Sequence, residues 1–338
     1  MNLNSYPMKK TFFILFLIAA LFIAFFAACT KDKHVSSVTL NRYAVTLAVG
    51  ETATLIATVH PDDADNKNLF WKTNQGEIIT VENGLVTAVA VGTAIVTVTA
   101  EEGDHTAHCT ITVIHPGESE MVGVEGGTFI MGISDNENPA HTSQERPPHQ
   151  VTLNSFKIAK YPVTQKQWNA IMEYNPSHFK GDNLPVENVS WNDVQTFISR
   201  LNAITGKNYR LPTEAEWEFA ARGGNNSINF PYSGHGDLGL AAWYYGNSDK
   251  MSHPVGQKTP NELKLYDMSG NVWEWCQDWA AEYSEQAQID PQGPATGTCR
   301  IARGGSYLSD YLKCRVSFRN GLTPNEFNNE TGFRLALP

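Results

Sequence analysis

Two carboxylates on either side of a tight turn form the best candidate ligand pair in this chain of 338 residues. Asp267 precedes the turn Met268-Ser269-Gly270-Asn271, and Glu274 follows it. This spacing lets both carboxylates and the carbonyl oxygens of the turn converge on a hard cation, and Ca²⁺ takes about six to eight oxygen ligands. The segment therefore predicts a calcium site. The alternative is that Glu274 makes a buried hydrogen bond between Trp273 and Trp275.

Two loops near the C-terminus have the composition of a binding surface. Residues 306–311 and 325–330 are rich in Tyr, Asn and Ser. Tyr gives rigid, amphipathic contact area, while Asn and Ser give adaptable hydrogen bonds. The alternative is that these residues only form loops. We predict a surface for a protein or glycan ligand made of Tyr307, Asp310, Tyr311, Asn325, Phe327 and Asn328.

Three predicted helices would position these loops. Thr164, Ser190 and Thr213 are N-cap residues that begin them, and Gly206 and Gly223 end the second and the third. The rest of residues 121–338 is rich in Gly, Pro, Asn and aromatic residues. Much of this domain should therefore be ordered loop, which needs an ion or a disulfide to hold it together.

The chain before this domain has a different pattern. Within residues 38–114, Thr alternates with Val or Ile at period two in short runs separated by glycines, and a helical stripe is absent. This pattern predicts a small antiparallel sandwich over residues 38–114. Residues 115–120 have the composition of a linker.

The first 28 residues are typical of an export signal. Lys9 and Lys10 precede an unbroken apolar run over residues 12–28. The sequence Phe26-Ala27-Ala28-Cys29 resembles a bacterial lipobox, with Phe26 in place of the usual Leu. We expect cleavage before Cys29, a lipid on Cys29 and a polar tether over residues 29–37. The alternative is an uncleaved membrane helix, since about 17 apolar residues can just span a bilayer.

Export would place the mature chain in the cell envelope, anchored by lipid to the outer or the cytoplasmic membrane and facing the periplasm or the cell surface. Without residues 1–28 the chain has 23 basic residues (25 minus Lys9 and Lys10) against 35 acidic ones, a formal charge of −12. Nucleic-acid partners require a basic surface, so this balance argues against them.

The cysteines and histidines lack the spacing of common metal sites, because neither a CxxC nor an HExxH motif is present. Outside the cytoplasm, cysteines more often form structural disulfides. Cys276 and Cys314 each end an apolar, strand-like run, whereas Cys299 lies in a loop rich in Gly and Pro. We therefore predict a Cys276–Cys314 disulfide.

Five short motifs carry a resemblance to a known family. They occupy residues 209–218, 220–224, 270–275, 303–306 and 332–334. Their order resembles the sulfatase-modifying-factor family, which includes the formylglycine-generating oxidases and many non-catalytic relatives. The resemblance implies a loop-rich variant of the C-type-lectin fold. Residues 84–94, with Phe70-Trp71 upstream, resemble a bacterial Ig-like group 2 domain.

The family resemblance also implies site residues. In the family, the turn holds calcium through two side chains and two backbone carbonyls, and the matching positions here are Asp267, Gly270, Val272 and Glu274. A second, weaker calcium site would begin at Asn247 and Ser248. Ser306 and Trp273 match residues of the oxidases' catalytic cleft.

The oxidases hold copper between two cysteines of the loop that follows residue 306. Ser309 stands at the first of these positions, and the loop before Cys314 is about three residues shorter than in the oxidases. A soft cuprous ion requires thiolates, so neither bound copper nor oxidase activity is expected.

We therefore predict an α+β chain in which an all-β Ig-like sandwich precedes a loop-rich, C-type-lectin-like domain. The expected function is that of an exported, lipid-anchored protein whose second domain binds a protein or glycan ligand without catalysis, with calcium as its ion. The alternatives are a copper-dependent formylglycine-generating oxidase acting on a sulfatase cysteine, and a structural subunit of a cell-envelope machine.

Overall fold

The computed structural model describes residues 33–133 and 143–338, which divide into two compact units. The predicted signal segment 1–28 and the predicted lipidation site Cys29 lie outside the described residues. Within the described part of the chain, no helix combines the length and the apolar character that crossing a membrane requires.

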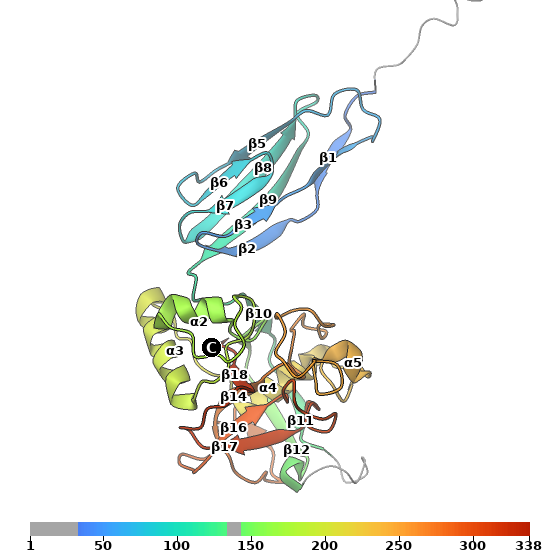
Figure 1. Ribbon diagram of the computed structural model, residues 1–338. Helices are drawn as coiled ribbons and strands as arrows, with labels where there is room; N and C mark the ends of the chain where they lie inside the picture. Colours follow the sequence, from blue (N-terminus) through green and yellow to red (C-terminus); the bar gives the residue numbers. More distant parts are fainter. Residues whose placement is uncertain (1–32, 134–142) are drawn as a thin grey trace, which may run out of the picture. The chain divides into compact units, whose positions relative to one another are not determined.

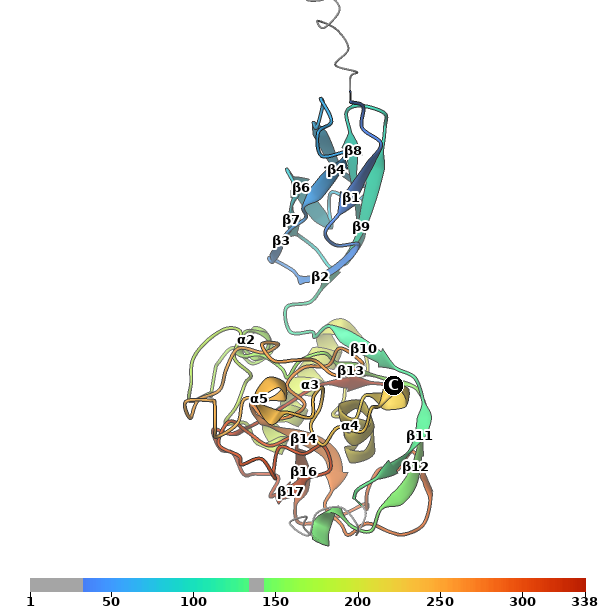
Figure 2. The same ribbon diagram turned by 90° about the vertical axis from the view of Figure 1, so that its right-hand side faces the viewer.

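The first unit is an antiparallel sandwich, as the period-two alternation of its sequence predicts. A four-stranded sheet has the order β2-β9-β8-β5, a three-stranded sheet has the order β3-β7-β6, and β1 pairs with β4 (Figures 1 and 2). Val96, Val98 and Ile111 fill its core and are fully buried. The strands are β1 (Ser37–Leu40), β2 (Ala44–Ala48), β3 (Thr52–Thr54), β4 (Ala57–His60), β5 (Leu69–Thr73), β6 (Ile79–Glu82), β7 (Leu85–Ala88), β8 (Gly92–Ala100) and β9 (Thr106–Ile114).

The second unit contains three small sheets joined by long ordered loops. The first has the order β10-β13-β19, the second β11-β12-β15, and the third, four-stranded sheet β17-β16-β14-β18. Its strands are β10 (Met121–Val124), β11 (Gly127–Met131), β12 (His149–Leu153), β13 (Phe156–Ala159), β14 (Trp273–Trp279), β15 (Gln288–Ile289), β16 (Arg300–Arg303), β17 (Arg319–Leu322), β18 (Thr331–Phe333) and β19 (Ala336–Leu337).

The predicted capping residues begin the three longer helices. These are α2 (Gln165–Met172), α3 (Trp191–Thr205) and α4 (Glu214–Ala221), and each starts with a complete capping box. Gly206 ends α3 in the left-handed conformation, with a φ of 68°. The helical segments α5 (Leu238–Ala241), η1 (Ser143–Glu145) and η2 (Gly224–Asn226) are single short turns. The predicted α+β fold class is confirmed.

Helix α4 packs between sheets on two sides, because it contacts β11 and β12 as well as β14 and β16 (Figure 2). All eight of its residues are buried, including three glutamates. Buried carboxylates need charged partners. Arg303 from β16 pairs with Glu218, and Arg319 from β17 donates to Glu214 at 2.7 Å from Nε. Burial alone would raise the pKa of Glu214, but Arg319 and Arg303 outweigh it and lower that pKa.

Candidate functional site

A cleft of about 300 Å³, which we call the serine cleft, opens at the start of β14. Trp273 contributes its ring, and Phe318 packs against that ring with centroids 5.9 Å apart. Loop residues before and after β17 complete the walls. The lining residues are Trp273, Leu308, Ser309, Lys313, Phe318, Asn320, Leu322, Asn328, Glu330 and Thr331. Of these residues, Trp273 belongs to the family motif over residues 270–275, and Leu308 and Ser309 follow the motif over residues 303–306.

Two serines and a glutamate form a hydrogen-bonded group at this cleft. The Ser306 hydroxyl donates to the Glu330 carboxylate and lies 3.2 Å from the Ser309 hydroxyl. Ser309 Oγ also accepts the backbone N–H of Ser306 at 2.9 Å. Ser306 and Ser309 are both buried, whereas Glu330 is half-buried. The group offers hard oxygen atoms of the kind that bind hydrogen-bonding ligands and hard cations.

Cys314 does not reach this group. Its side chain is buried in a small cluster with Leu238 and Ala242. The thiol lies so close to the backbone of Gly305 that a Cβ there would come within 2.9 Å of its sulfur. Burial raises the pKa of the Cys314 thiol, which keeps it protonated. The residues here do not fit a copper ion, because Ser309 supplies a hydroxyl and Cys314 a buried, neutral thiol.

The predicted Cys276–Cys314 disulfide is wrong, because both cysteines are free. Cys276 lies on β14 in the core cluster that includes Trp217 and Ile301, away from the cluster around Cys314. Burial also raises the pKa of the Cys276 thiol well above its usual value. Each sulfur therefore serves as a small apolar core atom.

The residues predicted to contact a ligand separate into exposed and buried ones. Tyr311 is 55% exposed and lies shortly after Ser309 of the serine cleft in the chain. Phe327 is 63% exposed and directly precedes Asn328 of the cleft. Asp310 and Asn325 are also exposed, and Asn328 lines the cleft.

The prediction is wrong for Tyr307, because this residue is fully buried. Its ring packs edge-on against Phe179 at 5.7 Å, and its carbonyl oxygen accepts the Ser248 hydroxyl at 2.7 Å. These contacts hold Tyr307 inside the domain, so it supports the cleft without touching a ligand on the surface.

The two carboxylates of the predicted calcium turn have different surroundings. Glu274 accepts two hydrogen bonds from Arg334, both at 2.6 Å, and a third from the Trp217 indole at 2.7 Å. Asp267 accepts the backbone N–H of Gly256 at 2.7 Å, and burial raises the pKa of Asp267 to about 6. Glu274 thus has the buried hydrogen bonds that the sequence offered as the alternative to calcium. Calcium at Asp267 stays a prediction.

Gly270 and Val272 are tightly packed within the turn. A Cβ at Gly270, whose φ is 74°, would lie 2.2 Å from the carbonyl oxygen of Trp243, and Val272 is fully buried. At the weaker predicted calcium site, Asn247 donates to the Ala242 carbonyl at 2.9 Å, while Ser248 donates to Tyr307. Among the described residues, no group of three or more His, Cys, Asp or Glu side chains is arranged to hold a metal.

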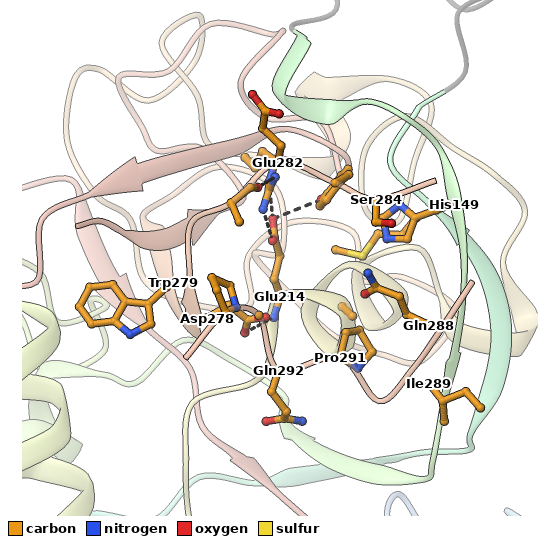
Figure 3. Close-up of a pocket in the computed structure, with 17 residues that line it drawn as sticks. His149, Glu214, Asp278, Trp279, Glu282, Ser284, Gln288, Ile289, Pro291 and Gln292 are labelled. Carbon is orange, nitrogen blue, oxygen red and sulfur yellow. Dashed lines mark hydrogen bonds and ion pairs between the residues drawn. The ribbon is translucent and has the colours of Figure 1, made fainter. Parts of the chain in front are cut away.

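A second cavity, of about 570 Å³, has different lining residues, and we call it the acidic pocket (Figure 3). Asp278 at the end of β14 and Glu214 at the start of α4 lie side by side in it, and Asp278 accepts the Glu214 backbone N–H at 2.8 Å. Sequence reasoning missed this pocket. The available signal was Asp278 itself, a lone carboxylate in the aromatic run Trp275-Cys276-Gln277-Asp278-Trp279.

Comparisons with known proteins agree with the two-domain organisation of the sequence. Residues 113–338 match the sulfatase-modifying factor enzyme 1-like domain, and residues 34–111 match the bacterial Ig-like domain (group 2). Both resemblances predicted from the motifs are confirmed.

Relatives of the second domain carry different names. Chaperone protein LppX of Paenibacillus barcinonensis is 34% identical over 266 residues, which cover 64% of this chain and 88% of the relative. A formylglycine-generating enzyme of Thermomonospora curvata is 30% identical over 292 residues, covering 64% of this chain and 92% of the enzyme.

Two solved structures share the fold. Treponema denticola variable protein 1 superposes with a TM-score of 0.60 at 32% identity, covering 64% of this chain and 94% of that protein. PvdO from Pseudomonas aeruginosa gives a TM-score of 0.56 at 29% identity, covering 65% of this chain and 94% of PvdO.

Proposed function

The chain belongs to the sulfatase-modifying factor enzyme 1-like family through residues 113–338, and we propose that its second domain binds a protein ligand at the serine cleft without oxidising it. One observation carries the proposal. The position expected to supply a copper thiolate holds the Ser309 hydroxyl, which is hydrogen-bonded to Ser306, and the thiol of Cys314 is buried with Leu238 and Ala242 and makes no hydrogen bond to either serine. The hydroxyl and carboxylate oxygens of Ser306, Ser309 and Glu330 suit a hydrogen-bonding ligand.

The surroundings of the cleft support a protein ligand over a glycan. Trp273 and Phe318 provide an aromatic wall, and Tyr311 and Phe327 are exposed aromatic side chains in the adjoining loops. Exposed aromatic residues beside a pocket are typical anchors of protein interfaces. Lys313 and Glu330 add one positive and one negative group, which would fix the register of a bound segment.

The test is a cross-linking experiment followed by affinity measurements. A photo-reactive amino acid at position 311 should capture a partner in the cell envelope, and the purified partner is then titrated against variants. Tyr311→Ala and Phe327→Ala should each weaken binding by about 2 kcal/mol, or roughly 30-fold. Tyr174→Ala is the control, because Tyr174 is 47% exposed and does not line the cleft. Equal affinity of all three variants and the wild type would refute the proposal.

The second candidate function is copper-dependent oxidation of a sulfatase cysteine, which the relative in T. curvata favours by its name. Incubating the wild-type protein with copper and a cysteine-containing sulfatase peptide tests it. Formation of an aldehyde on the peptide would replace the binding proposal with the oxidase one. Ser309→Cys should not create activity, because Cys314 stays buried in its own cluster.

We also propose that the protein is a lipoprotein of the cell envelope, with the Ig-like domain as a spacer. The support is the sequence Phe26-Ala27-Ala28-Cys29 after the apolar run. Labelled fatty acid should be incorporated into the wild type and not into Cys29→Ala. Equal labelling, or none in the wild type, would contradict this assignment.

A further inference from the structure

The acidic pocket lies apart from the serine cleft and shares none of its lining residues. Its volume of about 570 Å³ is within the range of small-ligand sites. Its walls come from the end of β14, the start of α4 and the loop over residues 281–294 (Figure 3). The polar side chains of the lining include the acidic Glu214, Asp278 and Glu282, the basic His149 and Arg319, and the amides Gln288 and Gln292; Trp279, Ile289 and Pro291 are among the apolar ones.

Asp278 is a buried carboxylate of this pocket with one oxygen that accepts no hydrogen bond from the described residues. It is 5% exposed, and its Oδ2 accepts the Glu214 N–H at 2.8 Å. Its Oδ1 accepts no hydrogen bond from the described residues, and no Lys, Arg or His nitrogen of that part of the chain lies within 4.0 Å of the carboxylate. Burial, and next the charge of Glu214, raise the pKa of Asp278 to about 7. A carboxylate held in this way favours a cation beside it.

The other charged side chains around the pocket do not supply a cation for Asp278. Glu214 is neutralised by Arg319, so Asp278 and Glu282 give the lining an excess of negative charge. The nearby cation Arg300 is engaged elsewhere, because its guanidinium stacks on the Trp279 ring at 3.6 Å and donates to the Gln277 carbonyl at 2.5 Å. A ligand would therefore bring its own positive charge.

The geometry distinguishes between two kinds of cation. A guanidinium binds a carboxylate best through two parallel hydrogen bonds, which need both oxygens. Oδ2 of Asp278 already accepts the Glu214 N–H from α4, whereas Oδ1 accepts no hydrogen bond from the described residues, so Oδ1 is the better acceptor for a ligand. An ammonium group is a compact point charge that needs a single strong acceptor and can share its other protons with the amides of Gln288 and Gln292. Ile289 and Pro291 would contact the aliphatic chain that carries it.

We propose that the acidic pocket binds a primary ammonium group on an aliphatic chain, such as a lysine side chain, with Asp278 as its main acceptor. This site is independent of the ligand proposed for the serine cleft. Gly293 is part of it, because a Cβ at this position would lie 3.2 Å from Oδ1 of Asp278 and narrow the space beside that oxygen.

The test uses three small probes and the full chain. Nα-acetyl-lysine methylamide, the arginine analogue and the norleucine analogue are titrated separately, and binding is followed by NMR at the Trp279 indole. The lysine probe should bind tightest, the arginine probe more weakly, and norleucine at least tenfold more weakly than lysine, since it lacks the charge. Equal binding of the lysine and norleucine probes would overturn the proposal, and this comparison needs no variant.

Variants then assign the acceptor. Asp278→Asn keeps an oxygen for the Glu214 N–H and removes the charge, so lysine binding should weaken about tenfold or more while the protein stays folded. Glu285→Gln is the matched control, because Glu285 is exposed and does not line the pocket, and it should change binding less than threefold. Unchanged binding in Asp278→Asn would overturn the assignment. Tyr311→Ala should leave lysine binding unaffected, which separates this site from the proposed function.

Discussion

Removing the carboxylate of Glu274 should destabilise the second domain by about 3–5 kcal/mol, because it would leave the buried guanidinium of Arg334 without its partner. Both side chains are fully buried, and three hydrogen bonds of 2.6–2.7 Å join Glu274 to Arg334 and Trp217. In a domain of this size each kcal/mol corresponds to about 2–4 °C, so Glu274→Ala should lower the Tm by roughly 6–20 °C.

Tryptophan fluorescence during urea unfolding is the suitable assay, since Trp71 alone of the eight tryptophans lies in the first unit. Measurements with and without EDTA separate two explanations. If Glu274 stabilises the domain through Arg334, Glu274→Ala loses the same unfolding free energy with and without EDTA. If Glu274 acts through calcium, EDTA lowers the unfolding free energy of the wild type to that of the variant. Replacing Glu274 and Arg334 together by Met should recover part of the loss, because no unpaired charge stays buried. A loss below about 1 kcal/mol in Glu274→Ala would refute the reasoning.

Three further predictions concern an ion, a proton and two thiols. Calcium at a hundredfold excess over its Kd should add about 2.7 kcal/mol of stability, and Asp267→Asn should remove this gain; a Tm insensitive to calcium and EDTA contradicts the site. Burial raises the pKa of Glu187 to about 7. The folded state therefore binds a proton at Glu187 more tightly than the unfolded state, so the unfolding free energy should fall as pH rises from about 4 to 7. Glu187→Gln should remove up to about 3 kcal/mol of that fall. A pH profile that is the same in the variant and the wild type would exclude this role of Glu187. Cys276 and Cys314 should both react with a thiol reagent after unfolding without reductant, and a disulfide-linked peptide containing both would show the structure to be wrong there.

Local signals in the sequence were enough for the three longer helices and for the strand pattern of the first domain. A capping residue acts on N–H groups three positions away, so Thr164, Ser190 and Thr213 mark helix starts without knowledge of the fold. The alternation of β8 and β9 likewise follows from the pleat of a strand. The family motifs added the arrangement of these elements, because their order and identity are specific to one fold.

The site depended on contacts between residues distant in the sequence. Glu274 meets Arg334 sixty positions later, so the turn around Asp267 alone suggested a calcium ligand where the structure has an ion pair. Tyr307 and Tyr311 share a side-chain type and a loop, yet packing against Phe179 buries the first and leaves the second exposed.

The sequence by itself therefore determined the fold class of both domains and the helix starts of the second, because these depend on residue identity and short-range hydrogen bonds. Only the tertiary structure decided which polar groups are already paired. Asp278 shows why: α4 supplies a partner for one of its oxygens and β14 turns the other toward the acidic pocket, and neither fact follows from the residues beside it in the chain.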